Sequence, residues 1–507
     1  MLASVRSATL LGVEGRPITV EVHVGNGLPA FQMVGLPDES CRESRDRVRA
    51  AVLSSGLVWP NARITVNLAP SGLRKGGSGL DLPIALGVLA ASDQLRPDLL
   101  GEHGFLGELG LDGSLRGVPG AAPMVAALVL HDEACRPVVP PTGYREASGV
   151  VGERVRVAGT LRELVDVLNA DAPWPRPPDD DVRDDDPLPP DLADVRGQPM
   201  ARLGLEVAAA GGHHLLFVGA PGSGKTMLAE RLSGLLPPLS RLASLEATMV
   251  HSAAGVGLPP GGLVRRPPFR APHHSSTMVS LVGGGSSSLR PGEVSIAHHG
   301  VLFLDELGEF APAVLDSLRQ PLEEGVIRVA RAASHATMPA RFLLVAATNP
   351  CPCGGGPPGS CECDDGARQR YLRRLSGPLL DRFDLRVAVA RPEVDDLLAQ
   401  GGGEPTTVVA ARVGAARQRS LTRIGIAAGA IPGERLDELA PVDAAARHRL
   451  RGALERGQLS ARGLHRVRRV ARTLADLAGD DEVVRDEHVA LALTLRVPLR
   501  ITRRNSV

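Results

Sequence analysis

Three short, unbroken apolar runs in the middle of the chain, at residues 215–218, 301–304 and 342–346, are typical of strands buried on both faces. Each run is separated from the next by segments that are compatible with helices. This alternation predicts an α/β region built on a parallel sheet. From about residue 392 the pattern becomes helical and rich in Ala, Leu, Arg and Glu, without a convincing strand.

The first part of the chain alternates short β-like runs with helical ones. Residues 18–24 and 64–68 alternate apolar and polar positions, as half-buried strands do. Residues 42–53 place apolar side chains at helical spacing, and residues 81–91 are typical of a buried helix. We therefore predict an α+β domain over residues 1–170.

A stretch rich in proline and aspartate, residues 171–191, follows this domain. It contains seven prolines and two runs of three aspartates. Prolines and like charges cannot bury a core, so an extended, solvated linker is predicted, with an acidic regulatory tail as the alternative. The rest of the chain is predicted to divide into a core over residues 192–390, with a glycine-rich insertion and a cysteine loop, and a C-terminal helical domain over residues 391–507.

The first apolar run leads into the pattern G-x-x-x-x-G-K-[ST] and then into an amphipathic helix. The pattern comprises Gly219, Ala220, Pro221, Gly222, Ser223, Gly224, Lys225 and Thr226. Glycines allow backbone N–H groups to surround phosphate oxygens, and the N-terminus of the helix adds partial positive charge. Lys225 is expected to reach the β- and γ-phosphates of ATP, and the Thr226 hydroxyl to bind Mg²⁺. A chance match is the alternative, but strand, loop and helix in this order favour a nucleoside triphosphate site.

Polar residues that suit the same chemistry follow the second and third apolar runs. Asp305 and Glu306 follow the second run. Because adjacent residues of a strand point to opposite faces, Asp305 is assigned to Mg²⁺ and Glu306 to activation of the attacking water. Asn349 follows the third run and is expected to hydrogen-bond that water or the γ-phosphate. An ordinary strand terminus is the alternative for the carboxylate pair.

Composition limits the partners and the compartment. Lys plus Arg and Asp plus Glu both number 57, so any affinity for nucleic acid must come from local basic surfaces. Aromatic residues make up only 2% of the chain, which argues against surfaces that stack bases. No apolar run approaches the roughly 20 residues that span a bilayer, and the N-terminus lacks the apolar region of a signal peptide. The six cysteines do not form a secreted disulfide framework, so a reduced cytoplasm is expected.

Four of those cysteines lie close together, at Cys351, Cys353, Cys361 and Cys363. Four thiolates in a loop rich in glycine and proline can close a tetrahedral zinc site. The C-x-C spacing is tighter than the usual C-x₂-C. We favour structural zinc here over a reduced, metal-free loop.

Residues 194–477 resemble the AAA+ ATPases, specifically the magnesium-chelatase-like branch that also contains the MCM replicative helicases. The resemblance is strongest to the competence-associated ComM/YifB family. It extends into the first domain and so covers nearly the whole chain. The similar segments are PHHS at 272–275, GGG at 283–285, RPGE at 290–293, HHG at 298–300, NPCPCG at 349–354, SGPLLDR at 376–382, ARTLADL at 471–477, VGLPD at 34–38 and NLAP at 67–70.

The resemblance implies an AAA+ P-loop core with a C-terminal helical lid. It further implies that Asn349 is a sensor, Arg382 an arginine finger and Arg462 a second sensor, in a ring that is usually hexameric and holds ATP between subunits. Family members are associated with DNA helicase and branch-migration activity on single-stranded or branched DNA during recombination of incoming DNA. Without the resemblance, Arg382 would be interpreted as an ordinary surface pair with Asp381 or Asp384.

A hairpin is predicted between residues 324 and 341, where the related helicases place one that projects into the central pore. Arg328 and Arg331 would then contact DNA phosphates, which is independent of sequence and sensitive to salt. The alternative is a solvated hairpin whose arginines pair with Glu323 and Glu324.

The first domain resembles the Lon-protease fold, which is ribosomal-S5-like, with Ser78 near the position of that family's nucleophile loop. Lon-type hydrolysis needs a lysine base, and residues 117–130 contain no lysine. Ser78 is therefore predicted to be a turn residue, and the domain to be non-proteolytic. Three rivals to a DNA-directed ATPase remain open, namely an ATPase subunit of a metal chelatase, an ATP-dependent protease and a DNA-independent protein remodeller.

Overall fold

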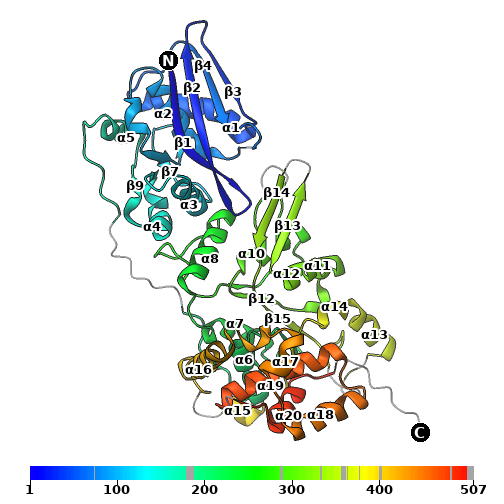
Figure 1. Cartoon of the computed structure of the whole chain (residues 1–507). Helices are drawn as coiled ribbons and strands as arrows, with labels where there is room; N and C mark the ends of the chain where they lie inside the picture. Colours follow the sequence, from blue (N-terminus) through cyan, green and yellow to red (C-terminus); the bar gives the residue numbers. More distant parts are fainter. Residues whose placement is uncertain are drawn as a thin grey trace.

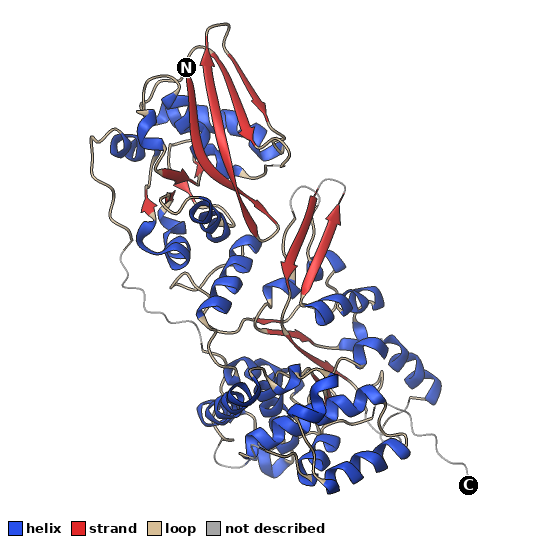
Figure 2. Cartoon of the chain, in the orientation of Figure 1, coloured by secondary structure: helices blue, strands red, loops and turns tan. Residues whose placement is uncertain are grey.

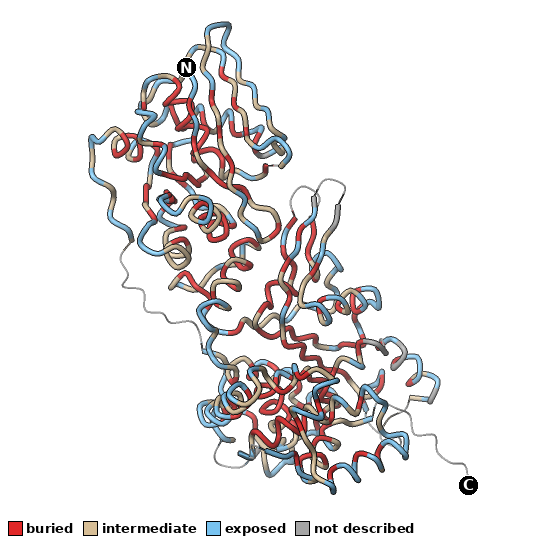
Figure 3. Tube along the Cα trace, in the orientation of Figure 1, coloured by how far each residue is buried: buried red, intermediate tan, exposed pale blue. Residues whose placement is uncertain are grey.

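The computed structural model of the chain describes residues 1–498 except residues 74, 179–187, 286–288, 332–333, 356–360, 362, 376, 399–401 and 480–481. The described residues form two large sheets, each with helices packed on it, and two small two-stranded pairs (Figure 2). Buried residues gather along the large sheets and the helices next to them (Figure 3). None of the described helices combines the length and the apolar character that a membrane crossing requires.

The N-terminal sheet has the strand order β3-β4-β2-β1-β5-β8-β9. β2 pairs antiparallel with β1 and β4, whereas β5, β8 and β9 continue from β1 in parallel. The strands predicted at residues 18–24 and 64–68 lie within β2 and β4 and are confirmed. The bounds are β1 (Leu2–Leu11), β2 (Glu14–Gly25), β3 (Ala30–Val34), β4 (Arg63–Ala69), β5 (His103–Phe105), β8 (Arg136–Val139) and β9 (Arg156–Val157), with β6 (Glu108–Leu109) and β7 (Leu115–Arg116) as a separate pair.

Helices between these strands complete the N-terminal part. Asp38 begins the first of them, because its carboxylate accepts a hydrogen bond from the backbone N–H of Cys41 at 2.9 Å. Every residue of α2 is buried, which explains its continuous apolar sequence and confirms the predicted buried helix. The helices are α1 (Glu39–Ser54), α2 (Asp81–Ala90), α3 (Ala121–His131), α4 (Tyr144–Val151) and α5 (Leu161–Leu168).

The second sheet is entirely parallel, with the order β11-β12-β15-β10-β16. Alternate residues of its strands belong to two different cores: Leu215 and Phe217 pack into one, and Leu216 packs into the other. The sheet is therefore buried on both faces, which confirms the parallel sheet predicted from the apolar runs. The strands are β10 (Leu215–Val218), β11 (Phe269–Arg270), β12 (Val301–Leu304), β15 (Leu343–Thr348) and β16 (Leu385–Ala388).

The segments before, between and after these strands carry the remaining elements of the middle of the chain. The predicted hairpin is confirmed as β13 (Val326–Arg331) and β14 (Ser334–Pro339), which pair antiparallel immediately before β15. The helices are α6 (Pro199–Gly211), α7 (Lys225–Leu235), α8 (Arg241–Ala254), α9 (Met278–Val282), α10 (Glu293–Ile296), α11 (Pro312–Ser317), α12 (Arg319–Glu324), α13 (Asp365–Arg374), α14 (Gly377–Leu380) and α15 (Val394–Leu398).

The C-terminal part is helical, and no strand follows β16 among the described residues, as the sequence pattern predicted. α19 is joined to the sheet at Asp384, which accepts a hydrogen bond from Arg466 at 2.5 Å and lies 3.4 Å from His213 Nδ1. Burial raises the pKa of Asp384, but His213 and Arg466 outweigh it and hold that pKa below its ordinary value. The helices are α16 (Thr406–Ile424), α17 (Leu436–Leu439), α18 (Ala444–Glu455), α19 (Ala461–Ala478) and α20 (Asp486–Thr494).

The N-terminal part touches the remainder of the chain at α8 and at the β13–β14 hairpin (Figure 1). On α8, the Ser252 hydroxyl accepts a hydrogen bond from the backbone N–H of Ala122 in α3 at 3.2 Å and donates to Glu146 of α4 at 2.6 Å. At the hairpin, Leu11 at the end of β1 and Val13 in the β1–β2 turn pack against the core that contains Met338. The β1–β2 turn approaches β14 so closely that a Cβ at Gly12 would lie 3.0 Å from the Cβ of Ala336.

Candidate nucleotide-binding site

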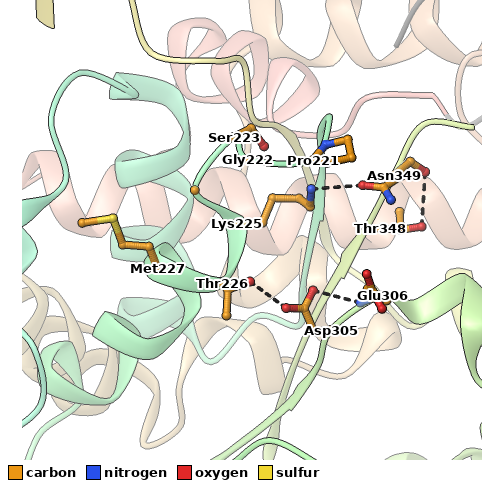
Figure 4. Close-up of a pocket in the computed structure, with 11 residues that line it drawn as sticks. Pro221, Gly222, Ser223, Lys225, Thr226, Met227, Asp305, Glu306, Thr348 and Asn349 are labelled. Atoms are coloured by element: carbon orange, nitrogen blue, oxygen red, sulfur yellow. Dashed lines mark hydrogen bonds between the residues drawn. The ribbon is translucent and has the colours of Figure 1, made fainter. Parts of the chain in front are cut away.

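The glycine loop at residues 219–224 joins the carboxyl end of β10 to the start of α7. Gly222 and Gly224 have φ angles of 74° and 89°, in the left-handed region that glycine adopts without strain. Lys225 is buried, and its ammonium group donates to the carbonyls of Gly219 and Ala220 at 2.8 and 2.9 Å. The loop thus closes around its own lysine (Figure 4).

Two features of this loop fit a bound phosphate and its metal. The Ser223 hydroxyl is buried without a hydrogen-bond partner among the described residues. The Thr226 hydroxyl donates to Asp305 at 2.6 Å, so that two oxygen ligands of the kind Mg²⁺ prefers already lie together. Burial lowers the pKa of Lys225, while Asp305 and Glu306 oppose that shift. A phosphate beside the ammonium group would favour its charged form further.

The loop lines a pocket of about 420 Å³ at the carboxyl end of the parallel sheet. The pocket brings together most of the residues predicted for ATP and Mg²⁺ with the predicted base and the first sensor, whereas Gly219 and Ala220 are not among its lining residues. Its lining consists of Pro221, Gly222, Ser223, Gly224, Lys225, Thr226, Met227, Asp305, Glu306, Thr348 and Asn349.

The separation of Asp305 from Glu306 has a different cause from the predicted one. β12 ends at Leu304, so strand alternation does not place the two carboxylates. Glu306 instead has a left-handed backbone with a φ of 49°, and its N–H donates to the Asp305 carboxylate at 2.9 Å. The turn directs Asp305 to Thr226 and leaves the Glu306 side chain more than half exposed, 3.3 Å from His274 Nδ1.

Asn349 lies just beyond β15, and its side-chain oxygen accepts a hydrogen bond from Lys225 at 3.2 Å (Figure 4). Its neighbour Thr348 is hydrogen-bonded at 3.1 Å to the hydroxyl of Tyr371, a buried residue of α13. Sequence reasoning assigned no role to His274 or Tyr371. His274 belongs to the PHHS segment at residues 272–275. That segment indicated the family but gave no indication that His274 contacts Glu306.

The two other predicted residues, Arg382 and Arg462, do not line this pocket. Arg382 forms an ion pair with Glu323 of α12, rather than with Asp381 or Asp384. Arg462 is exposed at the second position of α19. Burial lowers the pKa of Arg382, and the positive charges of Arg466, Arg462 and Arg319 lower it further.

Of the two hairpin arginines, only Arg328 has a side chain among the described residues. Arg328 forms an exposed ion pair with Glu324, four residues before it, as in the solvated-hairpin alternative. Such an exposed pair is worth little, so it leaves the Arg328 guanidinium open to exchange partners. The backbone of Arg331 pairs with Ser334, but the side chain of Arg331 lies outside the described residues.

In the N-terminal part, the hydroxyl of Ser78 donates to the carboxylate of Glu108. The nearby Lys75 is buried and donates to the carbonyl of Pro70. Each side chain therefore has a partner other than the one that a serine–lysine pair would need.

Three family models match the chain. "Magnesium chelatase, subunit ChlI" matches residues 191–397, "Subunit ChlI of Mg-chelatase" residues 20–142, and "Magnesium chelatase, subunit ChlI C-terminal" residues 403–496. The matches include the whole lining of the nucleotide pocket and the C-terminal helices α16 to α20.

Individual relatives match over nearly their whole length. An uncharacterized protein of Mycobacterium tuberculosis is 47% identical over 97% of both chains. The uncharacterized protein YifB of Escherichia coli is 42% identical over 98% of this chain and 97% of its own. The competence protein ComM of Haemophilus influenzae is 41% identical over 100% of this chain and 99% of its own. A partial match, to a probable DNA helicase MCM9 of Arabidopsis thaliana, is 26% identical over 34% of this chain and 22% of that protein.

Proposed function

The chain belongs to the ComM/YifB family of magnesium-chelatase-like AAA+ ATPases, and on that premise we propose that it is a ring-forming cytoplasmic enzyme that couples ATP hydrolysis to movement along, or remodelling of, DNA. The observation that carries the ATPase is the meeting of Lys225, Thr226, Asp305, Glu306 and Asn349 in one pocket at the carboxyl end of a parallel sheet. In this proposal residues 1–170, 171–191, 192–390 and 391–507 are the N-terminal domain, the linker, the core and the lid.

Each residue of the pocket has a separate task. Lys225 exchanges its carbonyl partners for the β- and γ-phosphates of ATP, and Thr226 and Asp305 hold Mg²⁺, which neutralises phosphate charge when bound. Glu306 accepts the proton of the attacking water. Asn349, which already contacts Lys225, orients that water or the γ-phosphate.

Arg382 and Arg462 enter the proposal as residues of a subunit interface. Both lie outside the pocket of their own chain, and Arg382 is half-buried against Glu323. An arginine finger supplied by a neighbouring subunit completes an ATP site only when the ring assembles. Such a ring, a hexamer in this proposal, makes hydrolysis depend on assembly.

Three observations support DNA as the partner. One relative is named a competence protein, and another is named a probable DNA helicase. The β13–β14 hairpin carries Arg328 in an exposed position, and the net charge of the chain is zero, so that contact must be local. Arginine contacts to phosphates would bind single-stranded or branched DNA without reading its sequence.

The test is the ATPase rate of the purified protein with and without DNA, in the double variant Arg328→Ala/Arg331→Ala. We expect loss of the DNA-stimulated rate and an unchanged basal rate. The slope of log K for DNA binding against log salt concentration should be shallower by about 1.4–1.8, because the variant lacks two phosphate contacts and so releases fewer counterions on binding. Arg435→Ala is the matched control, since Arg435 forms a similar exposed pair with Glu438 outside the hairpin. Unchanged DNA affinity and stimulation in the double variant would contradict the hairpin contact. An ATPase that no DNA stimulates would favour the chelatase or protein-remodelling alternatives.

A further inference from the structure

The sulfur atoms of Cys351, Cys353, Cys361 and Cys363 all lie within 4.8 Å of one another. Cys351 and Cys353 are separated by 3.4 Å between sulfurs, well beyond the roughly 2.05 Å of a disulfide. A zinc ion with four thiolates at about 2.3 Å has sulfurs about 3.8 Å apart by tetrahedral geometry. The cluster therefore has the dimensions of a closed four-thiolate site.

Groups around the cluster favour thiolates over thiols. Arg368 of α13 is almost fully buried, and its guanidinium donates to the sulfur of Cys361 at 2.6 Å. The backbone N–H of Gly355 donates to the sulfur of Cys353 at 3.4 Å. Donors that hold the ligand atoms from outside are a regular part of metal sites. A buried arginine that faces sulfur in this way stabilises negative charge there.

We infer that these four cysteines bind one zinc ion as thiolates and that the resulting centre holds one wall of the nucleotide pocket in place. Zinc fits because soft thiolate ligands select it and because four protein ligands leave no position for substrate, as in structural sites. Binding releases the thiol protons to solvent and involves no change of oxidation state.

Two routes connect the cluster to the pocket. The first is direct, because Gly354 lies against Pro221 of the glycine loop: a Cβ at Gly354 would stand 2.4 Å from the Pro221 ring. The second route runs through α13. Arg368 of this helix donates a hydrogen bond to the sulfur of Cys361. Tyr371, three residues after Arg368, is hydrogen-bonded to Thr348, the neighbour of Asn349. Loss of the metal would release both supports.

The first test is the zinc content of the full-length protein purified without added metal. We expect about one zinc per chain, released when a mercurial reagent blocks the thiols. Cys353→Ser should lose most of the zinc, and this exposed position spares the packing of the loop. Cys135→Ala, which changes a buried cysteine outside the cluster, should keep it. Two results would overturn the assignment. One is less than about a tenth of a zinc per chain in reduced wild-type protein that also takes up no added Zn²⁺. The other is iron bound in place of zinc.

The second test measures the affinity of a fluorescent ATP analogue before and after zinc removal, and it rests on the proposed nucleotide site. We expect several-fold weaker binding in Cys353→Ser and in the metal-depleted wild type, and no change in Cys135→Ala. Lys225→Ala should lose the nucleotide but keep the zinc. Unchanged affinity after zinc removal, in a wild type that binds the analogue, would overturn the coupling. Unchanged affinity in Lys225→Ala would instead overturn the nucleotide site and leave the zinc centre standing.

Discussion

Glu306 holds the least common backbone conformation in the candidate site. A φ of 49° is rare for a residue other than glycine, and it persists only where the surroundings stabilise it. Here the stabilising contact is the hydrogen bond from its own N–H to Asp305. The carboxylate is more than half exposed, contacts His274 and lines the pocket, where the proposed attacking water would lie.

Glu306→Gln is therefore expected to bind ATP normally and to hydrolyse it poorly. The amide preserves size and the backbone turn but cannot accept the proton, so kcat should fall by about 10²–10⁴-fold. Steady-state hydrolysis and nucleotide binding, measured on the same preparation, check this. Glu309→Gln is the control, because that carboxylate is also exposed and lies outside the pocket. Normal turnover in Glu306→Gln would remove it as the base.

Individual residues differ in how far the sequence predicts them. Lys225 and Thr226 follow from spacing alone, since the phosphate-binding loop is local. The direction of the Glu306 side chain does not follow from the sequence, because a single left-handed residue after a strand leaves no periodic signal. His274 and Tyr371 reach the site from segments distant in sequence, and only the folded chain brings them there.

At the scale of elements, the joint between α19 and the second sheet depends on one buried carboxylate. Asp384 accepts from Arg466, whose guanidinium also donates to the carbonyl of Arg382 at 3.0 Å. The joint thus fixes the backbone of the proposed arginine finger. Removal of the Asp384 carboxylate would leave the largely buried Arg466 without its counter-ion.

Asp384→Asn should destabilise the packing of α19 by about 3 kcal/mol at neutral pH, measured by hydrogen exchange of the α19 amides. The folded pKa of Asp384 lies below its unfolded value of about 3.9, so the ionised carboxylate stabilises the fold above that pH. The difference in stability between the variant and the wild type should shrink as the pH falls below this unfolded pKa and through the lower folded pKa. Asp437→Asn, at a 94% exposed partner of Arg468, should change little. An equally large effect there would mean that the burial of Asp384 is irrelevant.

Short, unbroken apolar runs predicted β10, β12 and β15, because a strand buried on both faces has no polar position. β11 and β16 escaped prediction for physical reasons. β11 has two residues and is defined only by its pairing with β12, while Arg386 interrupts the apolar pattern of β16 and reaches back to the carbonyl of Leu380. No local pattern marks such strands.

At the scale of the whole molecule, the position of Arg382 outside its own pocket can be tested by mixing subunits. Arg382→Ala and Lys225→Ala proteins should each be inactive, and an equal mixture should regain part of the ATPase. About one interface in four then pairs an intact glycine loop with an intact arginine. Activity and ring composition are measured on the same sample. Mixed rings without any recovery would identify the Arg382–Glu323 pair as purely structural.

The contact between the β1–β2 turn and the β13–β14 hairpin has a consequence for dissecting this chain. Leu11 and Val13 shield the apolar face of the hairpin around Met338 from water. An isolated ATPase fragment that lacks the first 170 residues would bare this face, and a bared apolar strand pair is prone to self-association. A fragment that keeps the N-terminal part is therefore expected to stay monodisperse where the shorter fragment associates.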